Sequence, residues 1–202
     1  MNIYRWAKKN IAGFLQKILR ITVRGAENEP LCGGVIAASN HTSFLDVIVL
    51  GIALKRQIRF LAKAELFKIP LLSALIRNLG AYSVDRGKGD VAAIKKTISL
   101  LQEGELIGIF PQGHRHKGVH PKGTEVKNGI GMMTYRSGAT VLPIFIKTQN
   151  YKMRFFGKKE VFIGKPISVD ELAFEAGNSA EYERVAEYIF DKILELEPKE
   201  SA

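Results

Sequence analysis

Short apolar runs alternate with helical patterns through most of this chain, and this alternation constrains the fold more than any other feature. The apolar runs, each short enough to be one buried strand, are residues 35–38, 60–62, 81–84, 106–110, 141–146 and 161–163. Asp90 is the predicted cap of a helix whose pattern stops at Gly104. Residues 128–136 predict a second helix, and an apolar stripe over residues 182–196 predicts a last one. This order indicates a single α/β domain with a mixed, largely parallel sheet flanked by helices.

The charge of the chain is unevenly distributed. It carries 30 Lys/Arg and 20 Asp/Glu, a formal net charge of +10. Residues 1–169 hold 27 of these basic side chains against 10 acidic ones, whereas residues 170–202 hold 3 against 10. A body this basic attracts polyanions, so the candidate partners are nucleic acid, an acidic carrier protein and an anionic membrane surface. Because no helix-turn-helix or aromatic stacking pattern accompanies the basic residues, we expect no nucleic acid partner.

Residues 1–24 contain six basic side chains and no acidic one. On a helical wheel the apolar side chains gather in one sector, with Lys8 as a charged exception inside it and Trp6 as an outlier outside it. A cationic amphipathic helix of this kind is typical of segments that lie on a membrane, although an ordinary helix packed on the domain has a similar pattern. We favour the membrane and predict a membrane-surface helix over residues 1–24, followed by the folded domain over residues 25–202.

Nothing in the sequence predicts a membrane span. The longest stretch without charge, residues 30–45, is 16 residues long and includes polar side chains, short of the roughly 18 apolar residues that indicate a span. We also expect no secretory signal. The single cysteine, Cys32, fits a reducing compartment. We therefore expect the protein on the cytoplasmic face of the cell membrane, peripheral or monotopic.

The segment SNHTSFLD, residues 39–46, places His41 and Asp46 five residues apart directly after an apolar run. Histidine can take and return a proton near neutral pH, and a neighbouring carboxylate fixes its tautomer and strengthens it as a base. Positions i and i+5 do not face each other on a helix, so we place His41 in the loop and Asp46 in the first turn of a helix capped by Ser43. Ser43 and Asp46 also have the spacing of a capping box, which gives the carboxylate a purely structural alternative.

Three further segments lie where strands are expected to end. They are GAYSVDRG at 80–87, FPQGHRH at 110–116 and VLPIFI at 141–146. The first two place Arg86 and Arg115 in turns, and the planar fork of an arginine suits a phosphate. Two arginines from separate turns would clamp one phosphate; solvated surface positions are the alternative.

In this order and at these intervals, NHTSFLD, GAYSVDRG, FPQGHRH and VLPIFI resemble the four motifs of the 1-acylglycerol-3-phosphate acyltransferase family, over residues 35–146. The resemblance implies a glycerol-phosphate acyltransferase-like fold, with residues 25–202 as the acyltransferase domain. It also implies an enzyme of phospholipid biosynthesis that transfers an acyl group from an activated donor to the free hydroxyl of lysophosphatidate and forms phosphatidate. The donor would be a thioester of acyl carrier protein or coenzyme A, or an acyl phosphate, and we expect no cofactor.

The resemblance also implies roles for individual residues. His41 is implied as the general base and Asp46 as the partner that orients it. The implied ligands of the acceptor and its phosphate are Arg86, Gln112, Gly113, Arg115 and Lys127, and Lys63 resembles another lysine of the site.

The third motif departs from the family pattern FPEGTRS at Gln112, His114 and His116. The glutamate of the pattern is thought to hold the acceptor glycerol, and Gln112 keeps an oxygen of similar reach but loses the negative charge. The alternative is therefore an acyltransferase-like membrane-surface protein that acts on another lysophospholipid or is catalytically impaired. With His120, the two histidines have a spacing that could serve zinc, but no cysteine or evident fourth ligand accompanies them, and we expect no metal site.

Overall fold

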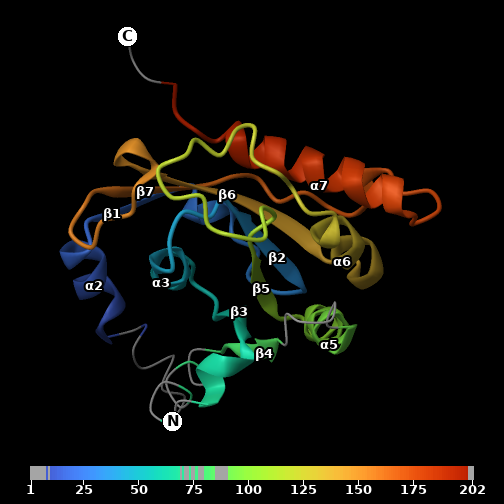
Figure 1. Ribbon diagram of the computed structural model, residues 1–202, viewed down its shortest axis with the longest axis horizontal. Coiled ribbons are helices and arrows are strands. Elements are labelled where there is room, and N and C mark those ends of the chain that lie inside the picture. Colours follow the sequence, from blue (N-terminus) through green and yellow to red (C-terminus); the bar gives the residue numbers. More distant parts are fainter. Residues whose placement is uncertain are drawn as a thin grey trace.

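The computed structural model describes residues 8, 10–68, 70, 73, 76, 80–84 and 91–199. Within these residues, seven strands form one sheet in the order β1-β7-β6-β2-β5-β3-β4 (Figure 1). The strands are β1 (Ile21–Arg24), β2 (Val35–Ser39), β3 (Ile58–Lys63), β4 (Tyr82–Val84), β5 (Leu106–Ile109), β6 (Thr140–Thr148) and β7 (Lys159–Ile163). Neighbouring strands are parallel except β6 and β7, which are antiparallel. The predicted mixed, largely parallel sheet is confirmed, and each of the six apolar runs overlaps a strand.

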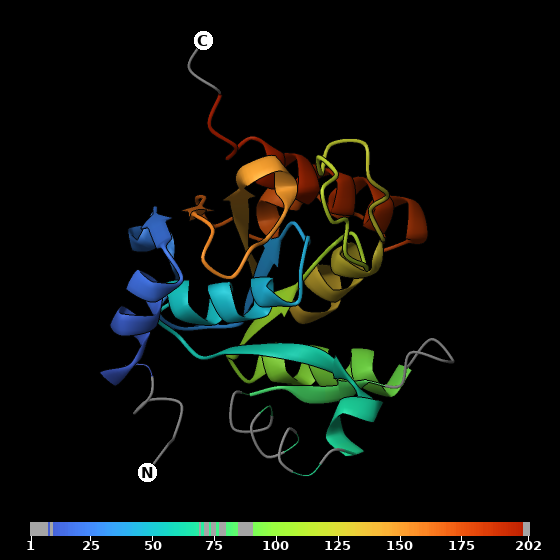
Figure 2. The same cartoon turned by 60° about the vertical axis from the view of Figure 1, so that its left-hand side comes forward.

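Helices cover both faces of the sheet (Figure 2). They are α2 (Ala12–Ile18), α3 (Leu45–Ala53), α5 (Val91–Gln102), α6 (Gly129–Ser137) and α7 (Ser179–Leu194), with short 3-10 turns at Ala26–Asn28, Ala64–Lys68, Gln149–Tyr151 and Asp170–Leu172. The helices α5, α6 and α7 pack on one face through side chains such as Leu101, Ile130 and Ile189. On the other face lie Leu50 of α3 and Leu19, the residue after α2. Because both faces are covered, all five residues of β2 are buried.

The three helices predicted after residue 90 agree with α5, α6 and α7. Asp90, the predicted cap of α5, lies outside the described residues.

The N-terminal segment is not one helix through residue 24, so that part of the prediction is wrong. The helix α2 ends at Ile18, Arg20 has a left-handed backbone conformation with φ of 52°, and β1 follows. In β1, Ile21 pairs with Lys159 in parallel register with β7. The β-branched residues 21–23 favour a strand, and the neighbouring edge of the sheet supplies the backbone partners that a strand needs.

Lys8, the charged exception in the predicted apolar sector, has a structural partner. Its ammonium donates hydrogen bonds to the carbonyls of Gly51, at 2.9 Å, and Ile52, at 2.6 Å, near the C-terminus of α3. Carbonyls at the end of a helix lack partners within that helix, and a cation is favoured there. Burial lowers the pKa of Lys8, and the charge of Glu29 opposes this shift.

The carboxyl ends of β2, β5 and β6 meet at one edge of the sheet, because these three strands are parallel. His41 lies just beyond β2, and Phe110 directly follows β5. This edge is where open α/β sheets bind their ligands. In the part of the chain that the structure describes, no helix is long and apolar enough to cross a membrane.

Candidate active site

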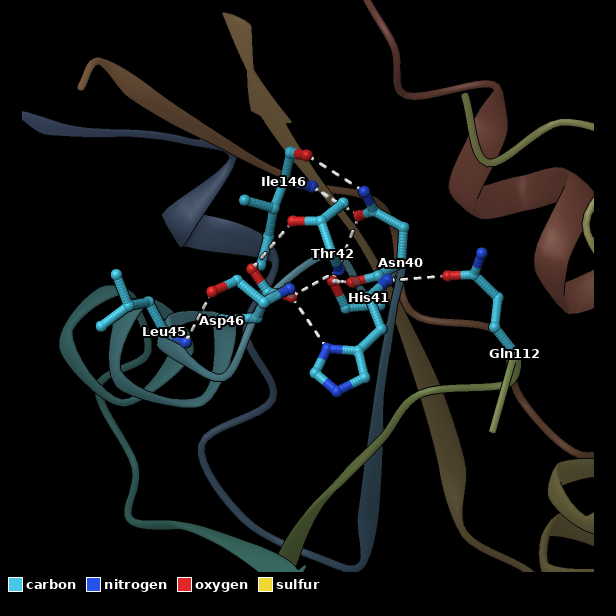
Figure 3. Close-up of polar contacts among 9 residues, drawn as sticks. Asn40, His41, Thr42, Leu45, Asp46, Gln112 and Ile146 are labelled. Atoms are coloured by element: carbon cyan, nitrogen blue, oxygen red, sulfur yellow. Dashed lines mark hydrogen bonds and ion pairs between the residues drawn. The ribbon is translucent and has the colours of Figure 1, made fainter. Parts of the chain in front are cut away.

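His41 and Asp46 meet beyond the carboxyl end of β2 (Figure 3). The Nδ1 atom of His41 lies 2.8 Å from Oδ2 of Asp46. The Asp46 side chain is 1% exposed and the His41 side chain 14%. Because the carboxylate holds Nδ1, the ring nitrogen that points away from Asp46 is Nε2, and this atom can face a substrate. The two side chains thus meet as their spacing in the sequence predicts.

The same carboxylate also closes the start of α3. Its Oδ2 accepts hydrogen bonds from the backbone N–H groups of Thr42, at 2.7 Å, and Ser43, at 2.8 Å, while the Ser43 hydroxyl accepts from the N–H of Leu45 at 3.2 Å. The helix begins at Leu45 with Phe44 at its N-cap position, one residue later than predicted. Asp46 therefore acts both as the cap of the helix and as the partner of His41, because one carboxylate has enough acceptor sites for both roles.

The imidazole of His41 rests against an aromatic ring. Phe110 stacks on it with ring centroids 3.8 Å apart and planes 10° apart. Phe60 of β3 in turn stacks on Phe110, with centroids 6.0 Å apart. Gly108 provides the space for Phe60, since a Cβ atom there would lie 2.1 Å from that ring. This stack restricts the orientation of the imidazole, and its only sequence signal was the position of Phe110 in the third motif.

Asn40 joins the first motif to the fourth. Its side-chain amide donates to the carbonyl of Ile146 at 3.1 Å, and the N–H of Ile146 donates to Asn40 Oδ1 at 2.8 Å (Figure 3). The side chain of Asn40 is fully buried, so both bonds are shielded from water. In the sequence, the one signal of this role was an amide side chain between a buried strand and the histidine.

Gln112 joins the third motif to the first. Its Oε1 accepts the backbone N–H of His41 at 2.7 Å, and its Nε2 donates to the Thr124 hydroxyl at 2.7 Å. That hydroxyl donates in turn to the carbonyl of Pro121 at 2.6 Å. The side chain is buried and both of its polar ends are engaged within the protein. These bonds tie the third motif to the backbone of His41, which gives Gln112 a positioning role in addition to the acceptor contact that the family resemblance implies.

Arg115 of the third motif and Lys127 lie on the long loop that follows β5, which we call the third-motif loop, and both side chains are exposed. The N–H of His116 donates to the carbonyl of His41 at 2.9 Å, which places the adjacent, exposed Arg115 near the site. Gly113 has a φ of 73°, and a Cβ atom at this position would lie 3.3 Å from Cγ of Lys127. The Lys127 side chain therefore passes next to Gly113, and it forms an ion pair with Glu125.

Two of the predicted residues are not placed at this site by the structure. Arg86 lies outside the described residues. Lys63 is the last residue of β3 and pairs with Val84 of β4, which fixes its backbone position alone.

The region that carries the four motifs matches a known protein family. The model of the family described as Acyltransferase matches residues 20–147, which include all four motifs. The chain belongs to the acyltransferase family. It is an enzyme of the transferase class, as the motif resemblance implies.

Several relatives of this acyltransferase carry a more specific name. A 1-acyl-sn-glycerol-3-phosphate acyltransferase of Bacillus subtilis is 31% identical over 182 residues, 89% of each chain. One of Borreliella burgdorferi is also 31% identical, over 71% of this chain and 56% of its own. The 1-acyl-sn-glycerophosphate acyltransferase PlsC of Thermotoga maritima, known from a crystal structure, is 26% identical in sequence. The two structures superpose with a TM-score of 0.69, and the match covers 98% of this chain and 84% of that chain. These relatives confirm the resemblance and place the acyltransferase in phospholipid biosynthesis.

The three histidines on the third-motif loop of this acyltransferase have different surroundings. The rings of His114 and His116 lie 4.8 Å apart, whereas Nε2 of His120 lies 3.0 Å from a Glu197 carboxylate oxygen. Among the described residues, no group of three or more side chains is arranged to hold a metal ion. Burial lowers the pKa of His116, and the charges of His114 and His41 lower it further. Next to the proposed base, His116 is therefore a predominantly neutral ring at pH 7.

Proposed function

We propose that this acyltransferase transfers an acyl group from an activated donor to the free hydroxyl of lysophosphatidate and forms phosphatidate, with His41 as general base and Asp46 as its orienting partner. The observation that carries this proposal is the 2.8 Å contact between Asp46 Oδ2 and His41 Nδ1, which leaves Nε2 to act on a substrate hydroxyl. The names of the relatives support the acceptor.

The reaction begins with the acceptor hydroxyl within roughly 3 Å of Nε2 of His41. Nε2 takes the proton as the hydroxyl oxygen attacks the acyl carbonyl carbon. The new carbon–oxygen bond forms, the bond to the thiol or phosphate leaving group breaks, and the imidazolium returns its proton to that group. Asp46 keeps its negative charge throughout and stabilises the imidazolium. Its two backbone donors and its buried position hold it in place for this task.

Cationic side chains hold the phosphate of the acceptor in this proposal. Arg115 and Lys127 lie on the exposed loop that contacts the His41 carbonyl through His116. Arg86 and Lys63 keep the roles that the motifs imply. The pairing of Lys127 with Glu125 means that phosphate competes with a carboxylate for this ammonium.

In this proposal the enzyme acts at the membrane surface. The N-terminal segment is cationic and amphipathic, and α2 has no buried residue. It docks the enzyme on the cytoplasmic leaflet, where a single-chain lipid acceptor and an acyl chain both partition. Acyl carrier protein, coenzyme A and acyl phosphate are all anionic donors that suit the basic body of the chain.

The proposal is tested by giving the purified enzyme each labelled donor with lysophosphatidate and identifying the product by mass spectrometry. We expect phosphatidate from the wild type and little from His41→Ala. The same assay with glycerol 3-phosphate and other lysophospholipids in competition decides the acceptor, which the departures at Gln112 and His114 make a necessary comparison. Preference for another acceptor would contradict the proposed substrate, and no transfer with any pair would contradict the proposed reaction.

A further inference from the structure

The connection between β6 and β7 presents two exposed aromatic side chains. Phe155 is 53% exposed and Phe156 66% exposed. Their rings contact each other edge to face, with centroids 4.9 Å apart. Two adjacent large apolar side chains exposed to this degree favour a surface that meets a partner.

Basic side chains flank this aromatic pair. Lys152, Arg154 and Lys158 are exposed, and residues 149–159 contain no acidic side chain. The ammonium of Lys158 lies 3.3 Å from a carboxylate oxygen of Glu160, at the base of the connection. An apolar tip between cations matches the interface of an anionic bilayer, where rings enter the acyl boundary and Lys and Arg contact phosphates.

A buried lysine fixes this connection beside the end of α2. The ammonium of Lys159 donates to the carbonyls of Phe155, at 2.7 Å, Gly157, at 2.8 Å, and Leu19, at 2.8 Å. Leu19 directly follows α2, so the connection and the C-terminus of this helix lie side by side (Figure 1). The position of the aromatic pair is thus set by the fold.

The neighbouring surface of α2 has the same character. Phe14 and Ile18, four residues apart and hence on one side of the helix, are 64% and 38% exposed. Lys17 and Arg20 are exposed next to them. We propose that residues 152–158 and the exposed side of α2 form one docking surface for an anionic lipid bilayer.

This docking surface lies at the edge of the sheet that carries His41, because β6 runs parallel to β2 and ends at Thr148, just before the connection. The inference builds on the proposed function, since it extends the membrane contact of a lipid-acting enzyme from the N-terminal segment to residues 152–158. Binding at this edge turns the entrance of the site toward the bilayer, so that a lipid acceptor reaches the imidazole without leaving the membrane.

The docking surface is tested by flotation of the whole protein with vesicles. Phosphatidylcholine vesicles are compared with vesicles in which phosphatidylglycerol replaces about a third of the lipid. We expect Phe155→Ser/Phe156→Ser to lower the partition coefficient on anionic vesicles about tenfold. Leu31→Ser is the matched control, because Leu31 is 71% exposed and precedes β2 at the opposite edge of the sheet. It should partition as the wild type does.

A second variant keeps the aromatic pair and removes the charge. Replacement of Lys152, Arg154 and Lys158 by glutamine should remove much of the preference for anionic over neutral vesicles. Both variants should transfer acyl groups to a short-chain, water-soluble acceptor, without vesicles, within about twofold of wild type, since the substituted side chains are exposed and distant in sequence from the proposed base.

Wild-type flotation by the Phe155→Ser/Phe156→Ser variant would overturn the docking surface, as would equal partition of the wild type onto neutral and anionic vesicles. Failure of the proposed function is distinguishable, because a wild type that transfers no acyl group still gives a flotation result. Loss of transfer to the water-soluble acceptor together with loss of flotation would mean that the aromatic pair supports the fold, and this too would overturn the inference.

Discussion

The loop that carries His41 and the loop that carries Arg115 lie next to each other, yet they are built in different ways. In residues 39–46, the side chains of Ser39, Asn40 and Asp46 are completely buried, and each is hydrogen-bonded. In the third-motif loop, Arg115 and Lys127 are exposed, and Lys127 pairs with an exposed carboxylate. A proton transfer requires atoms held within a narrow range of distance and angle, whereas attraction of a phosphate by cations acts over several ångström.

Because of this difference, we expect substitutions in the two loops to change different kinetic parameters. Changes in the buried loop should lower kcat, and where a buried polar group loses its partner they should also lower the free energy of unfolding. Changes in the exposed loop should alter KM for the phosphorylated acceptor and leave stability nearly unchanged. The following substitutions, taken from the largest expected effect to the smallest, test this division.

His41→Ala should lower kcat by about 10² to 10⁴, because the proposed proton acceptor is lost. The fold should persist, since Asp46 keeps its backbone donors from Thr42 and Ser43. Initial rates with lysophosphatidate measure the effect, and His120→Ala, whose imidazole pairs with Glu197, is the control. Turnover close to wild type in His41→Ala would remove the imidazole from the mechanism.

Asp46→Asn should affect both activity and stability. We expect kcat to fall by roughly 10²-fold, because an amide no longer favours the tautomer with a free Nε2 or stabilises the imidazolium. Urea unfolding should show a loss of about 1 to 3 kcal/mol, because a buried charged acceptor of backbone N–H groups is replaced. A variant that loses activity at full stability would contradict the double role of this carboxylate.

Gln112 tests whether a buried polar side chain of the third motif positions the base. Gln112→Leu should lower kcat about tenfold at nearly constant KM, because the His41 N–H loses its acceptor and the loop shifts. A rise in KM at constant kcat would instead favour direct contact with the acceptor.

Arg115→Ala should raise KM for the acceptor about tenfold with little change in kcat, because an exposed cation contributes binding and no proton transfer. Steady-state kinetics across acceptor concentrations measure this, with the exposed Lys122→Ala as the control on the same loop. A kcat effect as large as that of Gln112→Leu would erase the distinction between the loops.

Glu125→Gln should have the smallest effect and the opposite sign. The hydrogen bond from Lys127 lowers the pKa of Glu125, so this carboxylate is charged at pH 7 and competes with phosphate for the ammonium. Removal of the charge should lower KM for the acceptor by about twofold. A higher KM would indicate that Glu125 holds Lys127 in its binding position.

The sequence predicted the elements whose pattern is local. Runs such as 35–38 and 141–146 are apolar throughout because helices cover both faces of their strands, and this burial makes them recognisable. The strand β1 was missed because its four residues follow a helix without a glycine or proline between them, and Arg20 makes the turn instead. Lys8 was an anomaly on the helical wheel because its partners are carbonyls of α3, 43 and 44 residues away.

In the site, too, the sequence predicted the local contacts and missed the distant ones. The contact of His41 with Asp46 spans five residues and follows from helix geometry. The partners of Asn40 and Gln112 are 106 and 71 residues distant, and only the parallel arrangement of β2, β5 and β6 brings them together. Spacing alone therefore gave the contact of the proposed catalytic pair but could not reveal the hydrogen bonds of the buried Gln112.

The shared carboxylate of Asp46 has a consequence for the descent of this enzyme. A lineage that abandoned acyl transfer would be free to discard the imidazole, whose removal leaves the helix start intact, but selection for a folded protein would still retain the acid. An inactive homologue should therefore keep an aspartate at this position without the histidine. The residue five positions upstream should then distinguish active members of the family from inactive ones.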